Sequence, residues 1–374
     1  MNTPRFEYSL SAMSERIAEI ANLSAPFGFT PRYAMKANNH PRIIAAMHEH
    51  GIHFDASSSY EAAELLALKI PGDHISLSSQ QSPHNLPELL KAGVRFTATS
   101  KKQLALFLET INHPATVGVR INPDMGFGHN NRTSTGGVNA SFGIWHEYIP
   151  ELLTMTAAAG VSIDRLHVHI GSGADPKVWS EVMTRCLELV SLFPEVTTLD
   201  IGGGFKVHRF EEEKETDIAY VLKVFSDHLS NFADKSGREI HLEIEPGTFL
   251  IAHAGTLVAT IDDIVDTGPK GHTFLRLNTG MNDFLRSAMY GARHRIEVAG
   301  DATVQYPYIV VGHNCESGDI FTPAAGDPEG IEVRMLNKAS LGDEVRIFDV
   351  GAYSASMRAR GYNSFPDAEE VFID

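Results

Sequence analysis

Eight short β-rich runs separated by helical patterns constrain the fold of this chain more than any other feature. Most of the runs are apolar on both faces, which is typical of strands buried in a parallel sheet. Possible capping boxes at Ser58–Glu61 and Ser100–Gln103 mark helix starts between the runs. The eight runs are Arg32–Ala37, Ile52–Ala56, Ile75–Ser78, Arg95–Thr99, Thr116–Ile121, Arg165–Gly171, Thr198–Gly202 and His241–Glu245.

Eight strands, each followed by a helix or a crossover, predict a (β/α)8 barrel over residues 11–246. An open, doubly wound sheet is the alternative, but no Gly-x-Gly-x-x-Gly follows a strand to support it. After about Gly247 the helical periodicity fades, and β-rich runs such as Tyr308–Gly312, Glu332–Met335 and Glu344–Val350 are spaced by turn residues. We therefore expect a mostly β C-terminal domain over residues 247–374, with residues 1–10 added to it.

The composition excludes several classes of function. The formal net charge of −16 disfavours nucleic-acid binding, because phosphate would be repelled. We find neither an apolar run of transmembrane length nor a signal peptide, so we expect no membrane partner. With only two cysteines, Cys186 and Cys315, the chain fits a reducing cytoplasm better than a disulfide framework. The longest irregular stretch, Met125 to Phe142, is of a length that is often functional.

Residues able to do chemistry stand at most of the predicted strand ends, which is where barrel enzymes build their sites. Lysine is a poor structural choice at such a position, because burial disfavours its charge. A triple glycine lets backbone amides approach an anion closely. The residues at these ends are Lys36, Asp55, Arg120, His169, Ser172, Gly202, Gly203, Gly204 and Glu245.

A phosphate anchor, a strand-end lysine and a buried carboxylate together predict pyridoxal 5'-phosphate as the cofactor. That cofactor needs a lysine for its Schiff base, here Lys36, and a partner for its pyridine nitrogen, here Glu245. His169 could stack on the ring face. A metal enzyme is the alternative, but we expect His167 and His169 to point away from each other, which would prevent them from binding one metal ion together.

The sequence resembles the fold-type III pyridoxal-phosphate decarboxylases over nearly its whole length. This family includes diaminopimelate, ornithine and arginine decarboxylases, and it shares its barrel with alanine racemase. The matching motifs, in order along the chain, are Tyr33–Asn38, His167–Gly173, Asp200–Gly204, Glu245–Gly247, Cys315–Asp319 and Gly351–Tyr353.

The resemblance implies a role for each matching residue near the cofactor. Lys36 would carry the cofactor covalently, His169 would stack on its ring, and Glu245 would pair with the pyridine nitrogen. Asp55 and Arg120 would line the lysine side of the ring. The phosphate would be held by Ser172, Gly202, Gly203, Gly204 and Tyr353.

The resemblance also implies a substrate site that is shared between two subunits. Cys315, with a catalytic role, and Glu316 would reach into the neighbouring subunit's site, which implies a homodimer. Arg286 and Tyr290 would contact the distal end of a small amino-acid substrate. Both the Cys315–Asp319 motif and the run from Asn282 to Tyr290 resemble the diaminopimelate subgroup.

Three departures from that subgroup cluster around substrate recognition. Thr248 stands where relatives usually have arginine, Ser141 where they often have lysine, and His313 where they usually have proline. We expect decarboxylation of an amino acid with a charged distal group, diaminopimelate being the leading candidate. The alternatives are a siderophore or polyamine precursor, or a substrate of the ornithine or lysine type.

Two further classes share the barrel. Racemases pair the pyridine nitrogen with arginine, and Glu245 argues against that class. Non-catalytic pyridoxal-phosphate carriers lack the β domain that this chain retains.

Overall fold

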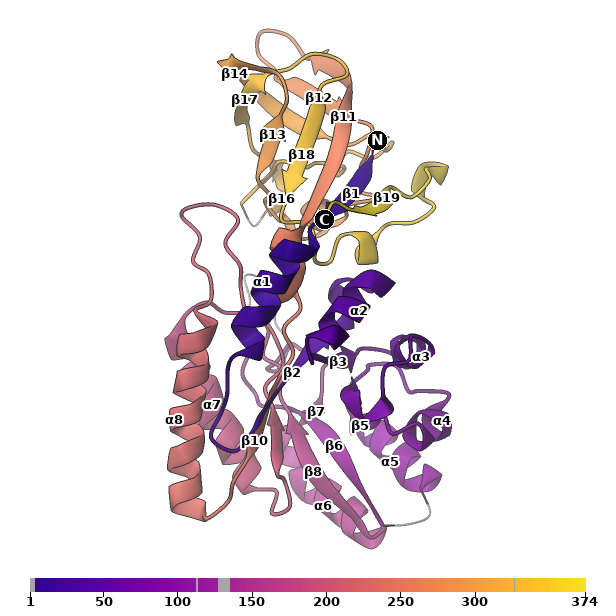
Figure 1. Ribbon diagram of the computed structural model, residues 1–374, viewed down its shortest axis with the longest axis vertical. Coiled ribbons are helices and arrows are strands. Elements are labelled where there is room, and N and C mark those ends of the chain that lie inside the picture. Colours follow the sequence, from indigo (N-terminus) through magenta and orange to yellow (C-terminus); the bar gives the residue numbers. More distant parts are fainter. Residues whose placement is uncertain (1–3, 112–113, 127–134, 326) are drawn as a thin grey trace. The chain divides into compact units, whose positions relative to one another are not determined.

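The computed structural model describes residues 4–111, 114–126, 135–325 and 327–374. Their contacts divide the chain into two compact units, each with its own sheet. Residues 16–206 and 215–249 form one, the barrel unit, and residues up to 15, 207–214 and 250–374 form the other, the sheet unit. Figure 1 traces the elements of both.

The barrel unit contains a closed barrel of eight parallel strands. Each strand pairs with the next in the order β2-β3-β4-β5-β6-β8-β9-β10, and β10 pairs with β2 to close the ring. The predicted barrel is therefore confirmed and the open doubly wound sheet is wrong. The strands are β2 (Phe29–Ala34), β3 (His53–Ala56), β4 (Ile75–Leu77), β5 (Arg95–Ala98), β6 (Ala115–Asn122), β8 (Val161–His167), β9 (Thr198–Asp200) and β10 (His241–Ile244). The short β7 (Ile144–Trp145) pairs with the last two residues of β6, Ile121 and Asn122.

Helices alternate with these strands, as the start signals predict. Ser58 caps α3 by accepting a hydrogen bond from the Glu61 amide at 3.1 Å, and Ser100 caps α5 in the same way through Gln103. These caps satisfy amides that the first helical turn leaves without partners. The helices are α1 (Leu10–Ala21), α2 (Pro41–Glu49), α3 (Ser59–Ala67), α4 (Leu86–Lys91), α5 (Lys101–Thr110), α6 (Ile149–Ala158), α7 (Pro176–Ser191), α8 (Ile218–Ser236) and α9 (Thr248–Ile251).

The interior of the barrel is charged, so the prediction of strands apolar on both faces is wrong for the inward face. Arg165 on β8 forms ion pairs with Asp200 on β9 and with Glu243 on β10, the latter at 2.7 Å. Arg32 on β2 and Arg95 on β5 also pair with Glu243, at 2.7 and 3.2 Å. The apolar pattern of the strands did not predict this charged inward face, because ion pairs between side chains on different strands compensate the buried charges.

The sheet unit is mostly β, as predicted, and contains a mixed sheet. Its main path is β13-β18-β11-β12-β14-β17, and β1 joins β11 to β19. Leu257, Val345 and Ile347 are fully buried in its apolar core. Its elements are β1 (Arg5–Tyr8), β11 (Gly255–Asp266), β12 (Thr273–Leu277), α10 (Arg286–Tyr290), β13 (Ile296–Val298), β14 (Asp301–Val311), β15 (Pro323–Ala324), β16 (Asp327–Ile331), β17 (Arg334–Lys338), β18 (Glu344–Phe348) and β19 (Glu369–Phe372).

Within the described residues, no helix has the length and apolar character needed to cross a membrane. The irregular stretch from Met125 to Phe142 lies partly outside the described residues, which omit 127–134.

Candidate active site

The predicted site residues of the barrel unit lie on the segments that follow the strands. Lys36 stands on a single 3-10 turn, Met35–Ala37, directly after β2. His169 and Ser172 come after the end of β8 at His167, and Glu245 comes directly after β10. Several expected strands are thus one to four residues too long at their carboxyl ends. These segments nevertheless belong to the edge of the barrel where such enzymes place their chemistry.

Lys36 faces a buried carboxylate. Its Nζ donates to Ser57 Oγ at 3.0 Å and lies 3.9 Å from Asp55 Oδ2, while its side chain remains 45% exposed. Asp55 is fully buried and accepts a hydrogen bond from Ser78 Oγ at 3.2 Å. Burial raises the pKa of Asp55, and the Lys36 charge acts in the opposite direction. The amine therefore remains open to reaction while a carboxylate holds it in position.

Glu245 carries a buried oxygen without a partner. Its Oε1 has no hydrogen bond among the described residues, and its Oε2 lies 3.6 Å from His167 Nε2. Burial raises the pKa of Glu245 well above its usual range, and the carboxylates of Asp200 and Asp55 raise it further. Burial, followed by the charge of Arg120, lowers the pKa of His167 well below its usual range, so His167 is neutral near pH 7. Glu245 Oε1 is thus a buried acceptor that has no hydrogen-bond donor among the described residues.

The triple glycine brings the backbone against His169. A Cβ on Gly202 would lie 2.3 Å from His169 Nδ1, and a Cβ on Gly204 would lie 1.9 Å from the Gly171 carbonyl. The amides of Gly202 and Gly203 donate to Asp200 Oδ1 at 2.9 Å and to His169 Nδ1 at 3.2 Å. Of the three amides, only that of Gly204 is therefore left to bind an anion in the described structure. The prediction that all three glycines bind the phosphate is thus reduced to the Gly204 amide.

Arg120 and His169 complete the group within the barrel unit. Arg120 is buried at the end of β6, with its guanidinium 5.1 Å from the centre of the Phe142 ring. Burial lowers the pKa of Arg120, whereas Glu245 and Asp55 raise it. Burial, together with the charges of Arg120 and Lys36, keeps the pKa of His169 well below its usual range. A neutral His169 ring is suited to stack on a flat, electron-poor ring.

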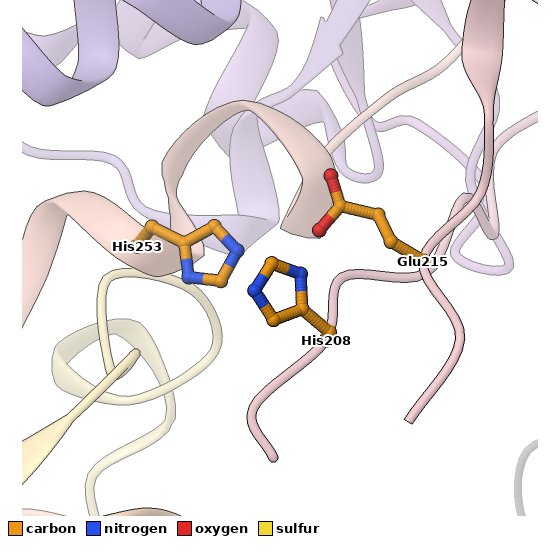
Figure 2. A group of neighbouring side chains, drawn as sticks. All are labelled: His208, Glu215 and His253. Atoms are coloured by element: carbon orange, nitrogen blue, oxygen red, sulfur yellow. The ribbon is translucent and has the colours of Figure 1, made fainter. Parts of the chain in front are cut away.

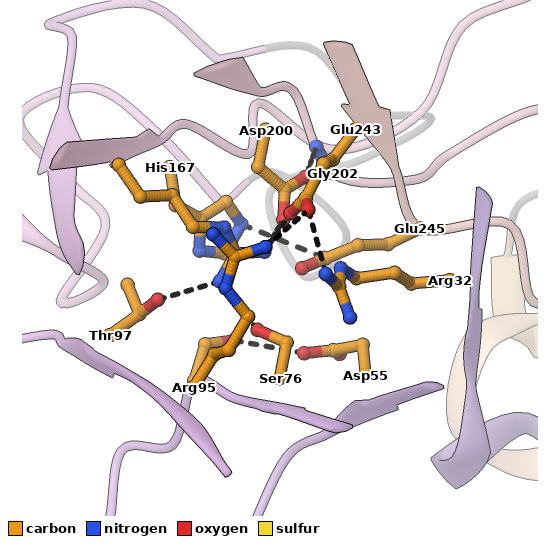
Figure 3. Close-up of polar contacts among 12 residues, drawn as sticks. Arg32, Asp55, Ser76, Arg95, Thr97, His167, Asp200, Gly202, Glu243 and Glu245 are labelled. Atoms are coloured by element: carbon orange, nitrogen blue, oxygen red, sulfur yellow. Dashed lines mark hydrogen bonds and ion pairs between the residues drawn. The ribbon is translucent and has the colours of Figure 1, made fainter. Parts of the chain in front are cut away.

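Sequence reasoning missed the residues beneath this group. Asp200 lies beside both His167 and Glu245 (Figure 3), and side-chain N and O atoms of the three lie within 4.8 Å of one another. Arg165 pairs with Asp200. His167 thus meets two carboxylates and not His169. The expectation that two residues of one strand at this spacing point to opposite faces was wrong, because residues two apart share a face. The available signal was the alternation of Arg165, His167 and His169 along one run, which places polar side chains on the inward face.

The sheet unit contains the other predicted residues. Arg286 and Tyr290 begin and end the short helix α10, and Tyr353 has a positive φ of 55°. Cys315 and Glu316 are exposed; the Cys315 amide donates to Asn363 Oδ1 at 2.8 Å, and Glu316 Oε2 accepts from the Tyr362 hydroxyl at 3.3 Å.

Pyridoxal phosphate fits the residues of the barrel unit. Glu245 Oε1 is a buried acceptor without a partner, as the N–H of a protonated pyridine ring requires. Lys36 offers an accessible amine, and the glycine cradle has no space for side chains. A parallel barrel with this lysine, carboxylate and glycine loop defines a pyridoxal-phosphate enzyme.

The family follows from comparison with known proteins. Residues 10–252 match the family described as pyridoxal-dependent decarboxylase, pyridoxal binding domain, and residues 219–351 match the corresponding C-terminal sheet domain. The chain belongs to the pyridoxal-dependent decarboxylases. Its cofactor is pyridoxal phosphate, and its reaction is the decarboxylation of an amino acid.

Named relatives agree with this family. The chain is 33% identical to diaminopimelate decarboxylase from Streptomyces coelicolor, over 92% of this chain and 79% of that protein. It is 31% identical to the enzyme of the same name from Escherichia coli K12, over 92% and 83%. A crystal structure of a diaminopimelate decarboxylase superimposes with a TM-score of 0.89 at 28% identity, covering 99% of this chain and 88% of that one.

Proposed function

We propose that this enzyme removes a carboxyl group from an amino acid with a charged distal end, and that diaminopimelate is its leading substrate. The observation that carries the proposal is the buried Glu245 carboxylate, which has an oxygen without a partner and belongs to the same barrel unit as Lys36. Pyridoxal phosphate supplies an electron sink at the carbon that loses its carboxyl group. The names of the relatives support diaminopimelate as the substrate.

We assign the remaining roles to this chain's own residues. Lys36 binds the cofactor, Glu245 holds a proton at the pyridine nitrogen, and neutral His169 orients the ring. Asp55 and Arg120 line the lysine side. Phosphate binding is assigned to the Gly204 amide, Ser172 and Tyr353, with Gly202 and Gly203 keeping the loop in place through Asp200 and His169.

To test the substrate, the purified enzyme is incubated with a panel of amino acids and the release of carbon dioxide is measured. Meso-diaminopimelate should give the highest specificity constant, ahead of L-lysine, L-ornithine and L-arginine. A higher value for a substrate without a distal carboxylate would reject diaminopimelate but leave decarboxylation intact. A siderophore or polyamine precursor remains the alternative because of Thr248.

Thr248→Arg should improve the handling of diaminopimelate. Threonine supplies a hydroxyl where relatives have a guanidinium, and a guanidinium can bind a carboxylate through two parallel hydrogen bonds. We expect the Michaelis constant for meso-diaminopimelate to fall roughly tenfold, with little change for L-lysine. Efficient use of diaminopimelate by the natural enzyme, with no gain in the variant, would reject Thr248 as a determinant of specificity.

We also propose a homodimer with shared active sites, to which Cys315 and Glu316 contribute from the neighbouring subunit. Their exposure supports this role. Inactive Lys36→Ala and Glu316→Ala proteins, mixed in equal amounts and allowed to exchange, should recover about a quarter of the natural activity, because half the dimers would regain one site.

The matched control mixes Lys36→Ala with Glu245→Gln. Both changes lie in the barrel unit, so each site of the mixed dimer keeps one defect and no activity should return. Equal recovery in both mixtures, or recovery in neither despite proven exchange, would contradict a shared site.

A further inference from the structure

Two arginines of the sheet unit lack the carboxylate partner that comparable arginines have. Arg209 lies in the segment between β9 and α8, and its Nε and Nη2 are buried without a hydrogen bond in the described structure; the same holds for Arg286 Nε. Among the described residues, every other arginine with such a buried, unbonded nitrogen has an ion pair with Asp or Glu. Those arginines are Arg32, Arg165, Arg293, Arg334 and Arg358.

The surrounding carboxylates are already engaged. The charge of Asp349 raises the pKa of Arg209, but Asp349 Oδ1 lies 2.6 Å from His253 Nδ1. The His253 ring in turn lies beside the His208 ring (Figure 2). Glu213 Oε2 accepts a hydrogen bond from the backbone amide of Arg209 at 2.8 Å. Glu332 pairs with Arg293 and Arg334. The charges of Asp349 and Glu213 raise the pKa of Arg209, but neither carboxylate forms a salt bridge with its guanidinium among the described residues.

The two guanidiniums influence each other. Burial, followed by the charge of Arg209, lowers the pKa of Arg286 to about 9. Burial and both arginines also lower the pKa of His294 well below its usual range, and His294 Nδ1 donates to the Phe348 carbonyl at 2.8 Å. Two neighbouring cations beside a neutral histidine are costly unless an anion joins them.

We propose that Arg209 and Arg286 together bind the distal carboxylate of the amino-acid substrate, so that Arg209 determines specificity. This inference rests on the proposed function, which already gives Arg286 the distal end of the substrate. Two guanidiniums can each donate to one carboxylate, which gives strong, charge-assisted hydrogen bonds. The cofactor phosphate is the other anion in question; we assign it to the Gly204 amide, Ser172 and Tyr353, and the test below separates the two anions.

The test uses Arg209→Gln in the full-length holoenzyme, with pimelate as the probe. Pimelate has two carboxylates but no amino group, so its dissociation constant reports binding without turnover. We expect Arg209→Gln to weaken pimelate binding roughly ten- to hundredfold and to raise the Michaelis constant for meso-diaminopimelate similarly. Turnover of L-lysine, which lacks the distal carboxylate, should change less than threefold, about 0.7 kcal/mol or less.

Arg276→Gln is the matched control, because Arg276 is an exposed arginine of the same unit and pairs with Asp263. It should leave pimelate binding unchanged. Unchanged pimelate affinity in Arg209→Gln would overturn the proposal, as would a loss of affinity for pyridoxal phosphate in place of pimelate. An enzyme that shows Arg209-dependent pimelate binding but releases no carbon dioxide from any amino acid would overturn the proposed function and leave the carboxylate site standing.

Discussion

Lys36→Ala should abolish the covalent link between protein and cofactor and reduce turnover at least about a thousandfold. The natural protein should be yellow, and borohydride should fix the cofactor to the peptide that contains Lys36. The physical reason is the accessible Nζ, which Asp55 holds at 3.9 Å. The measurement is mass spectrometry of the reduced, digested protein together with its absorption spectrum.

Lys101→Ala provides the control for removing a lysine. Lys101 is exposed and pairs with Glu151 at 3.0 Å on the outer helices, so its loss should change neither colour nor turnover. A cofactor that borohydride still fixed to the Lys36→Ala protein would assign the link to another lysine.

Glu245→Gln should keep much of its cofactor affinity and lose roughly a hundred- to a thousandfold in turnover. An amide cannot hold a full negative charge against a protonated pyridine nitrogen, so the electron sink weakens. Turnover close to that of the natural enzyme would mean that another group protonates the ring.

The same variant should stabilise the cofactor-free enzyme at high pH. Because folding raises the pKa of Glu245, its contribution to stability is complete below the usual glutamate range and is lost as the pH rises through the raised value. Glutamine has no such titration. The melting temperature of the variant should therefore exceed that of the natural apoenzyme more at pH 8 than at pH 5. An equal difference at both pH values would show that Glu245 does not titrate in this window.

The barrel could be predicted because its signal is local. Each strand is a short apolar run followed by a helix start, and caps such as Ser58 and Ser100 form as the sequence indicates. The positions of Lys36 and Glu245 after their strands follow from the same pattern. Where the strands end could not be predicted as well, because residues such as Met35–Ala37 continue the apolar pattern while the backbone already turns.

The charged layer and Arg209 could not be predicted from the sequence. Arg165 and Asp200 are 35 residues apart, and only the pairing of β8 with β9 makes them partners. Arg209 lies in an irregular segment without periodicity, so nothing local distinguishes it from a surface arginine. Its lack of a partner becomes visible only when the contacts of all the described arginines are compared.

The ion pair between the first and last barrel strands limits how early the barrel can close during translation. Arg32 on the first barrel strand pairs with Glu243 on the last, 211 residues later, and both side chains are almost fully buried. At translation rates of about 5–20 residues per second, Arg32 waits roughly 10–40 s for this partner to leave the ribosome. The nascent barrel therefore stays open through most of its synthesis, and the charge of Arg32 is paired with that of Glu243 only once the final strand has arrived.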